Sequence, residues 1–237
     1  YPRCWGSRRL PLGRWLKLVI QLRRRHYDAI MVADVGRSPQ LMASCIGAPL
    51  RVGFVYKNRR WALHQWITRH PGDGMPEINS YEKLAGLLTG QPSTAPSYVY
   101  QISQRDGEQA AAWLRQRQLL AGQFIVIAPG GGRNPGTDMP RKRWLPERFR
   151  YVIDRIPSDI PVLVLGADID YAIVSEVCAA TRAIPVTQLP LEIVAAVVAQ
   201  ARAVLCNDSV IMHLAACFKI PTLALFGPTN PYLLAPP

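Results

Sequence analysis

The hydrophobic residues of the chain follow two alternating patterns. Short continuous runs, such as residues 124–128 and 161–165, have the length of buried strands, whereas segments such as 146–156 carry apolar residues at helical spacing. Strands that alternate with helices in this way are typical of a parallel sheet with helical crossovers. The pattern therefore predicts an α/β fold.

The same alternation predicts the elements of both halves of the chain. In the first half we expect helices over 16–25, 38–46, 81–88 and 108–120, and strands over 27–33 and 51–55. In the second half we expect strands over 124–128, 161–165, 203–206 and 222–226, and helices over 146–156, 170–180, 191–201 and 209–218. We predict two Rossmann-like domains, residues 1–120 and 121–237, with Gly122 as the C-cap that ends the helix before the boundary.

The positive charge lies at the front of the chain, and this bears on what that region binds. The net charge is +12, and residues 1–70 hold 14 Lys/Arg against 2 Asp/Glu, which accounts for all of it. Such a concentrated field attracts an anionic surface, whether membrane phosphate, phosphorylated glycolipid or nucleic acid. A solvated basic face without a ligand is the alternative.

Hydropathy and cysteine usage predict a soluble, cytoplasmic chain. No apolar run approaches the roughly 18 to 20 residues that a membrane-spanning helix needs, and the start lacks the apolar core of a signal peptide. The cysteines form no CxxC pair, so the sequence predicts neither a zinc site nor a disulfide framework. They lie in or beside apolar runs, which favours buried thiols in a reducing compartment: Cys4, Cys45, Cys178, Cys206 and Cys217.

Three loops of the second half follow predicted strands, where ligands of open α/β sheets bind. The first is Pro129-Gly130-Gly131-Gly132, with Lys142 further along the chain just before a helix. Glycines let backbone N–H groups approach a phosphate closely, and a lysine supplies a compact positive charge. An ordinary flexible loop with solvated basic residues is the alternative.

The second loop, Asn207-Asp208-Ser209, joins a predicted strand to a predicted helix. Asp208 or Ser209 can cap that helix, whose start offers free N–H groups and a positive dipole end to an anion. His213 lies four residues after Ser209 and therefore on the same helical face, where it can donate a hydrogen bond to a phosphate or a sugar. Taken singly, a capping side chain and a helical histidine are more often structural.

The third loop, residues 226–231, ends a buried strand in the turn Gly227-Pro228-Thr229. Thr229 is the residue there with a hydroxyl donor. A turn of this composition needs no function by itself, so this loop gains meaning only together with the other two.

The three loops together resemble one family. The order PGGG…KRWLPERF, VLVLGADID, NDSVIMHLAAC and PTLALFGPTNP is similar to the C-terminal half of family 9 glycosyltransferases, the lipopolysaccharide heptosyltransferases, over residues 121–237. The first half resembles their N-terminal domain more loosely, through RRRHYDAIMVAD, LMASCIGAP and INSYEKLAGLL, without its opening strand. The resemblance implies a GT-B architecture of two Rossmann-like doubly wound domains facing a cleft, the chain being cut at both ends.

By this resemblance the second half holds a nucleotide-sugar donor. Lys142 would neutralise the donor diphosphate, and Leu189 would flank the nucleoside. Asp168 or Asp170 would lie near the position where the family can carry an acidic residue that contacts the ribose. The residues that would bind the donor are Gly130, Gly131, Lys142, Leu189, Asp208, Ser209, His213 and Thr229.

Two departures from the family pattern matter. Val210 and Ile211 stand where the family has Gly-Pro, and they add bulk at the start of the helix. The family's proposed catalytic base is an aspartate in its first strand-to-helix loop, which is expected upstream of Tyr1. Asp34 follows a later strand and is not assigned this role, so the catalytic residue is unknown.

The resemblance implies inverting, metal-independent transfer of a sugar, heptose from ADP-heptose, to a lipopolysaccharide core or lipid A acceptor. No cofactor or metal is expected, and the implied partners are the donor, an anionic glycolipid and the inner face of the cytoplasmic membrane, with the chain a monomer. Two alternatives stay open. One is a nucleic-acid-binding module built on the basic first third, where arginines are interleaved with Trp61 and Trp66. The other is an inactive fragment of the fold.

Overall fold

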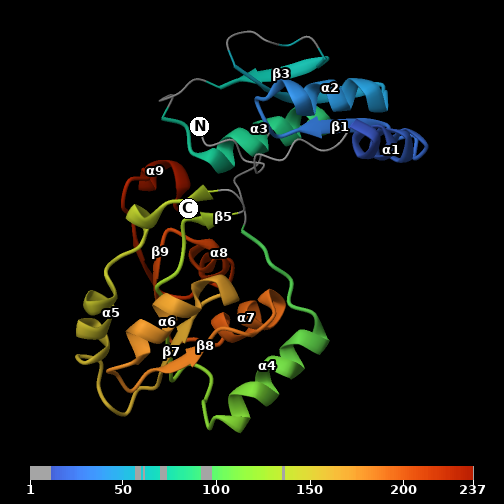
Figure 1. The fold of residues 1–237 in the computed structure, drawn as a ribbon. Helices are drawn as coiled ribbons and strands as arrows, with labels where there is room; N and C mark the ends of the chain where they lie inside the picture. The colour runs from blue at the N-terminus through green and yellow to red at the C-terminus, as the bar shows by residue number, and fades with distance from the viewer. Residues whose placement is uncertain are drawn as a thin grey trace. The chain divides into compact units, whose positions relative to one another are not determined.

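The computed structural model describes residues 12–56, 60, 62–69, 74–91, 98–134 and 137–236. The chain forms two compact units (Figure 1). The N-terminal unit is Ser7–Pro96 with Tyr232–Leu234, and the C-terminal unit is Ser97–Pro231 with a short piece of each chain end. Both units contain a parallel sheet, which confirms the predicted α/β class.

The C-terminal unit is built on a five-stranded parallel sheet with the order β10-β9-β4-β7-β8. Its strands are β4 (Ile125–Ala128), β7 (Val162–Leu165), β8 (Ile184–Val186), β9 (Ala203–Asn207) and β10 (Thr222–Leu225). Counted within the unit, the order is 3-2-1-4-5, the arrangement of a Rossmann-type sheet. The pattern did not predict β8, an edge strand of three residues that contains Pro185.

Helices cover both faces of this sheet, as buried parallel strands require. On one face α4 (Gln104–Gln116), α7 (Leu191–Val198) and α8 (Val210–Cys217) contribute to the larger core. On the other face α5 (Pro146–Ile153) and α6 (Tyr171–Cys178) enclose a second core around Phe149. Two short 3₁₀ turns, η1 (Pro140–Lys142) and η2 (Asp168–Asp170), and a two-stranded hairpin of β5 (Arg133–Asn134) and β6 (Thr137–Asp138) complete the unit.

The helix expected over 108–120 is α4, which begins and ends four residues earlier. Ser103 caps it, because its Oγ accepts a hydrogen bond from the N–H of Asp106 at 3.1 Å. Gly122 is not its C-cap, so that prediction was wrong. Gly122 instead lies in a turn at φ +74, and its N–H donates to the carbonyl of Gln200 at 2.8 Å.

The division between the units also differs from the predicted boundary near residue 120. It falls between Pro96 and Ser97, so α4 belongs with the C-terminal unit. The reason is packing: Ala110 and Leu114, on the apolar face of α4, are buried in the same core as α7. An amphipathic pattern shows that a helix has a buried face, but it does not show which sheet that face covers.

The N-terminal unit has a three-stranded parallel sheet with the order β1-β2-β3. Its elements are α1 (Leu12–Arg23), β1 (Ala29–Val32), α2 (Arg37–Ile46), β2 (Leu50–Val55), β3 (Gln65–Thr68) and α3 (Glu77–Thr89), and the short helix α9 (Pro231–Leu234) comes near the chain end. Phe54 and Leu84 are fully buried in its core. The apolar pattern did not predict β3, whose four residues are half-buried or exposed.

We expect Leu114→Ala to destabilise the C-terminal unit, because Leu114 is 2% exposed on the face of α4 that joins its core. Truncation of a buried leucine should lower the free energy of unfolding by about 2 to 5 kcal/mol. Urea unfolding followed by circular dichroism measures it. The matched control is Leu120→Ala at a position 62% exposed, which should change stability by less than about 0.5 kcal/mol. Equal effects of the two substitutions would contradict the position of α4.

Candidate functional site

The candidate site lies at the switch point of the C-terminal sheet, where the strand order reverses between β4 and β9. The loops after these two strands touch. A Cβ atom added at Gly131 would lie 3.3 Å from the carbonyl oxygen of Asp208 and 3.4 Å from the Cβ of Ser209. Gly131 also has φ +126, a conformation that side chains rarely adopt. Close approach and backbone conformation together require glycine here.

A buried amide holds the site together. Asn207, at the end of β9, is fully buried, and its Nδ2 donates to the carbonyls of Pro129 at 2.8 Å and Gly130 at 3.2 Å. Its Oδ1 accepts a hydrogen bond from the backbone N–H of Trp144 at 3.1 Å. One side chain therefore joins the β4 loop, the segment before α5 and the start of α8. The sequence pointed to the motif that contains Asn207 but did not include it among the site residues.

Lys142, Asp208 and Thr229 form a cluster that joins three loops. The Nζ of Lys142 lies 2.7 Å from Oδ2 of Asp208, and the Thr229 hydroxyl donates to the same oxygen at 2.8 Å. The Lys142 and Asp208 side chains are only 16% and 8% exposed. The structure thus brings together three residues that the sequence assigned to one site from widely separated positions.

The charge of Lys142 is compensated in this structure. Its ammonium group has three N–H donors, and Asp208 accepts from it through a single oxygen. Among the described residues, no other ion pair or hydrogen bond of this ammonium group is seen. Asp208 thus fixes the position of the ammonium group, as preorganisation for a negatively charged group would require.

The start of α8 has no side-chain cap. Ser209 occupies the N-cap position, but its hydroxyl makes no capping hydrogen bond, and Asp208 turns toward Lys142 instead. Ser209 is therefore the N-cap residue, as one of the two expected candidates, but it does not make the side-chain hydrogen bond of a cap. The Ser209 Oγ is buried and has no hydrogen-bond partner among the residues that the structure describes. An uncapped helix start beside an unsatisfied hydroxyl is a place where a bound anion gains hydrogen bonds from both.

Val210 and Ile211, the two residues that depart from the family pattern, differ in solvent exposure. Ile211 is 8% exposed and packs into the larger core of the C-terminal unit. Val210 is 51% exposed at the first position of α8. Only Val210 therefore adds accessible bulk at the helix start.

His213, one turn into α8, is half-buried and stacks against Tyr98, with ring centroids 5.9 Å apart and planes at 8°. Burial lowers the pKa of His213, and the nearby Asp208 carboxylate opposes this shift only in part. The imidazole is therefore neutral near pH 7, with one nitrogen that donates and one that accepts.

Asp170 reaches the β4 loop from η2. A Cβ atom at Gly130 would lie 2.6 Å from the carboxylate carbon of Asp170, so a side chain at Gly130 would displace that carboxylate. Its Oδ2 accepts from the N–H of Ala167 at 3.2 Å. Of the two aspartates that the sequence offered, the structure brings Asp170 to this edge of the sheet, whereas Asp168 makes no such contact among the described residues.

Arg143 is a further residue of the site that the sequence missed. Its Nε donates to the carbonyl of Gly131 at 2.9 Å, and its guanidinium group forms an ion pair with Asp138. Arg143 and Asn207 therefore both bind carbonyl groups of the glycine loop. Leu189, between β8 and α7, packs against the larger core, and its nucleoside contact stays a prediction.

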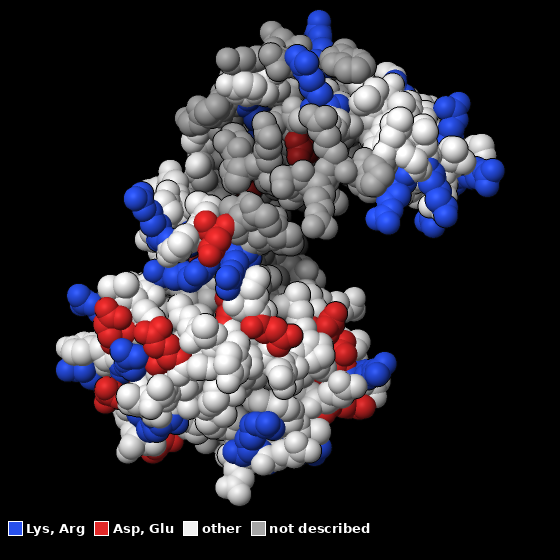
Figure 2. Space-filling view, viewed as in Figure 1, with Lys and Arg blue, Asp and Glu red and all other residues white. Residues whose placement is uncertain are grey.

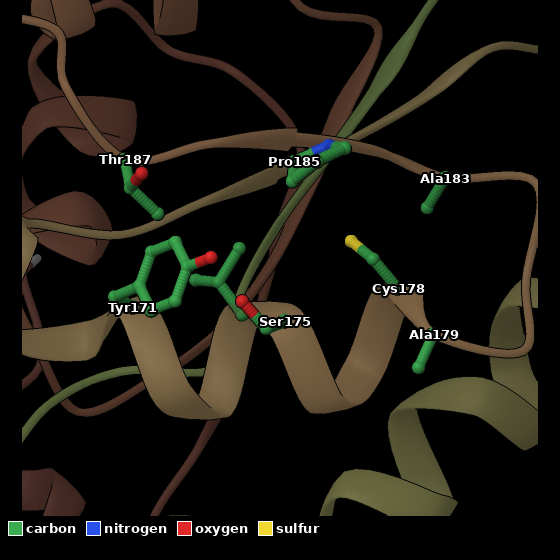
Figure 3. Close-up of a pocket in the computed structure, with 8 residues that line it drawn as sticks. Tyr171, Ser175, Cys178, Ala179, Ala183, Pro185 and Thr187 are labelled. Carbon is green, nitrogen blue, oxygen red and sulfur yellow. The ribbon is translucent and has the colours of Figure 1, made fainter.

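A separate depression of about 420 Å³ lies between α6 and β8 (Figure 3). Tyr171 and Thr187 lie near one end and Cys178 and Ala183 near the other, and most of the lining is apolar. It contains none of the predicted site residues and lies at the edge of the sheet, two strands from β4. The depression is therefore separate from the polar loops at the switch point.

Among the described residues, no group of three or more His, Cys, Asp or Glu side chains could hold a metal ion.

The described cysteines are free thiols, and Cys4 lies outside the described residues. Cys206 is buried as expected, and burial, together with Asp208, raises its pKa to about 12. Cys45, Cys178 and Cys217 are only half-buried, so the expectation of buried thiols was wrong for these three.

Comparisons with known proteins agree with this fold. A model of glycosyltransferase family 9 (heptosyltransferase) matches residues 15–237. Lipopolysaccharide heptosyltransferase 2 of Escherichia coli (strain K12) is 25% identical over 252 residues, which cover 99% of this chain and 70% of that protein. The chain thus spans 70% of the length of this relative.

Two solved structures are similar to the chain in fold. The glycosyl transferase family 9 structure from Veillonella parvula DSM 2008 matches with a TM-score of 0.80 and 19% identity, over 96% of this chain and 66% of that one. The structure of E. coli ADP-heptose lps heptosyltransferase II matches with a TM-score of 0.75 and 22% identity, over 94% of this chain and 69% of that one.

The two parallel α/β units and these structural relatives define a fold of the GT-B type. The chain belongs to glycosyltransferase family 9, the heptosyltransferase family. The roles of the individual site residues stay predictions.

We expect Asn207→Asp to destabilise the protein by about 3 kcal/mol, because it replaces the Nδ2 donor with an oxygen that faces the carbonyls of Pro129 and Gly130. Urea unfolding at pH 7 measures the loss. Gln101→Glu, the same chemical change at an exposed position, is the control and should shift the free energy of unfolding by less than about 0.5 kcal/mol. A stable Asn207→Asp variant would show that the amide does not hold the loops.

Proposed function

We propose that this chain binds a nucleotide-sugar donor through its diphosphate and transfers the sugar, with inversion, to a lipopolysaccharide core or lipid A acceptor. The observation that carries the proposal is the Lys142–Asp208–Thr229 cluster beside the uncapped start of α8. The donor is ADP-heptose and the reaction needs neither metal nor cofactor. Two relatives support this choice of substrates through their names, lipopolysaccharide heptosyltransferase 2 and ADP-heptose lps heptosyltransferase II.

The site residues act on the leaving group. As the bond between the sugar and the diphosphate breaks, negative charge grows on the diphosphate oxygens. Lys142 and the first N–H groups of α8 stabilise that charge. The hydroxyl of Ser209, for which the described part of the chain offers no hydrogen-bond partner, donates to it. A group fixed in advance for this charge is typically worth about 3 kcal/mol of the barrier.

The acceptor hydroxyl must also lose a proton to a general base. None of the described residues is assigned that role. Asp34 follows β1, and its Oδ1 accepts a hydrogen bond from the N–H of Gly36, so the structure explains this carboxylate by the local turn. The catalytic base of the reaction therefore stays unassigned.

We expect Lys142→Ala to weaken ADP binding roughly 10- to 100-fold, because a charge-assisted hydrogen bond to the diphosphate is lost and Asp208 is left unpaired beside it. Isothermal titration calorimetry with ADP measures the change. Arg148→Ala, which removes a positive charge from the exposed side of α5, is the control and should bind ADP as the unsubstituted protein does.

Three results would count against the proposed donor site. One is that the unsubstituted protein fails to bind ADP or UDP, the second is that Lys142→Ala binds ADP unchanged, and the third is that a short oligonucleotide raises the melting temperature more than either nucleotide. The last would favour the nucleic-acid-binding alternative.

We further propose that the N-terminal unit binds the inner face of the cytoplasmic membrane, where the monomeric protein meets its anionic glycolipid acceptor. No helix in the described part of the chain is long and apolar enough to cross a membrane. Lys and Arg side chains gather at the end of this unit that carries α1, whereas both signs are interleaved on the C-terminal unit (Figure 2). The acceptor's phosphates would be attracted by the same field.

The surface of α1 supports a membrane rather than a nucleic acid as the partner. Leu12, Leu16 and Ile20 are 72%, 46% and 50% exposed and recur at every fourth position, so they form one apolar stripe. Exposed Lys17 and Arg24 lie beside that stripe on the same helix or its continuation. Aliphatic residues flanked by basic ones are typical of a helix that lies in a lipid interface.

We expect the double variant Lys17→Glu, Arg24→Glu to lose at least roughly 10-fold in binding to vesicles that contain anionic lipid, at about 1 kcal/mol for each basic residue at the surface. Co-sedimentation at rising salt concentration measures it, and binding by the unsubstituted protein should weaken as salt rises. Arg148→Glu, Arg202→Glu, the same charge change on exposed residues of the C-terminal unit, is the control. Salt-independent binding, or equal losses in the two variants, would contradict the proposal.

A further inference from the structure

The segment that enters the C-terminal unit packs along α8. Tyr100 and Ile102 lie against the larger core, and the ring of Tyr100 meets Phe218 edge-to-face at 6.0 Å. Val99, between the two tyrosines, is 77% exposed, so alternate residues of this extended segment face the unit. Tyr98 is the first described residue of the segment, and it faces His213.

The contact between Tyr98 and His213 is specific in geometry. Their ring planes differ by 8° and their centroids are 5.9 Å apart, within the range of offset-stacked rings. Among the described residues, no hydrogen bond to the imidazole accompanies this stack. The stack is therefore the contact that sets the plane of the imidazole, on the turn of α8 that follows Ser209.

The surroundings keep both rings uncharged. Burial, reinforced slightly by Cys217, raises the pKa of the Tyr98 phenol. Burial also lowers the pKa of His213 against the opposing effect of Asp208. A neutral imidazole held between Tyr98 and the body of α8 presents a fixed donor and a fixed acceptor, which suits recognition of a phosphate oxygen and a sugar hydroxyl.

We propose that Tyr98 is a positioning residue of the donor site, which stacks on His213 and holds its imidazole in the orientation that binds the donor. This role rests on the donor site proposed above. Loss of the ring would leave the loops and Lys142 in place but would free the imidazole to rotate about its side-chain bonds. Ordering the imidazole on binding would then cost conformational entropy and weaken the affinity for the donor.

The test compares Tyr98→Leu with Tyr98→Phe by calorimetry with ADP. Tyr98→Leu removes the stacking ring and should raise the Kd for ADP roughly 3- to 10-fold. Tyr98→Phe keeps the ring and should bind ADP within about twofold of the unsubstituted protein, because aromatic stacking does not need the hydroxyl. Tyr100→Leu, which removes a ring from the same segment that meets Phe218 instead, is the control and should leave ADP affinity unchanged.

A double-substitution cycle separates positioning from a general loss of structure. In a His213→Gln background, Tyr98→Leu should have no further effect on the Kd, because Tyr98 acts through the imidazole. The ring resonances of His213, assigned by their absence in His213→Gln, give a second readout. In Tyr98→Leu the pKa of His213 should rise toward its ordinary value, because the ring becomes more exposed to water.

The outcomes distinguish this inference from the proposed function. If the unsubstituted protein does not bind ADP, the donor site itself is wrong and the role of Tyr98 falls with it. If it binds ADP and Tyr98→Leu binds equally well, or if the effect of Tyr98→Leu persists unchanged in the His213→Gln background, only the positioning role is overturned.

Discussion

The candidate site depends on hydrogen bonds to one buried amide. The side chain of Asn207 uses both its donor and its acceptor inside the protein, on the β4 loop and on the N–H of Trp144. It therefore presents nothing to a ligand. Its contribution is that Gly131, Lys142 and the start of α8 occupy fixed positions before any ligand arrives, so that fewer groups need to be ordered on binding. A buried amide with a partner for each polar group can be that rigid, whereas one left unsatisfied would weaken the fold.

The balance of charge at the site is as informative as its geometry. The ammonium group of Lys142 is paired with Asp208, and Thr229 donates to the same carboxylate oxygen. Asp208 thus stabilises the lysine and would also repel an anion bound beside it. In the donor site that we propose, a diphosphate would therefore bind less tightly than at an uncompensated lysine. That balance would suit an enzyme, which must stabilise charge as it develops and then release its product.

The fold and the meeting of the three loops at one edge of the sheet were largely predictable, because both follow from patterns along the chain. Glycines after a buried strand and a polar triplet before an apolar helix mark the edge of a sheet even when no contact is known. The contacts themselves were not predictable, because they depend on the packing of loops that are distant in sequence. Asp208 pairs with Lys142 instead of capping α8, and Asp170 rather than Asp168 reaches Gly130. The position of α4 was missed for the same reason, because its apolar face fits either sheet until the tertiary contacts of Leu114 are known.

The extended segment over residues 98–102 carries a constraint of register. Tyr98, Tyr100 and Ile102 contact the C-terminal unit, whereas Val99 between them is exposed. Because successive side chains of an extended segment point to opposite sides, the insertion or deletion of one residue there would turn an inward-facing side chain toward solvent. Such a change would separate the tyrosine ring from the imidazole although every loop residue of the candidate site stays the same.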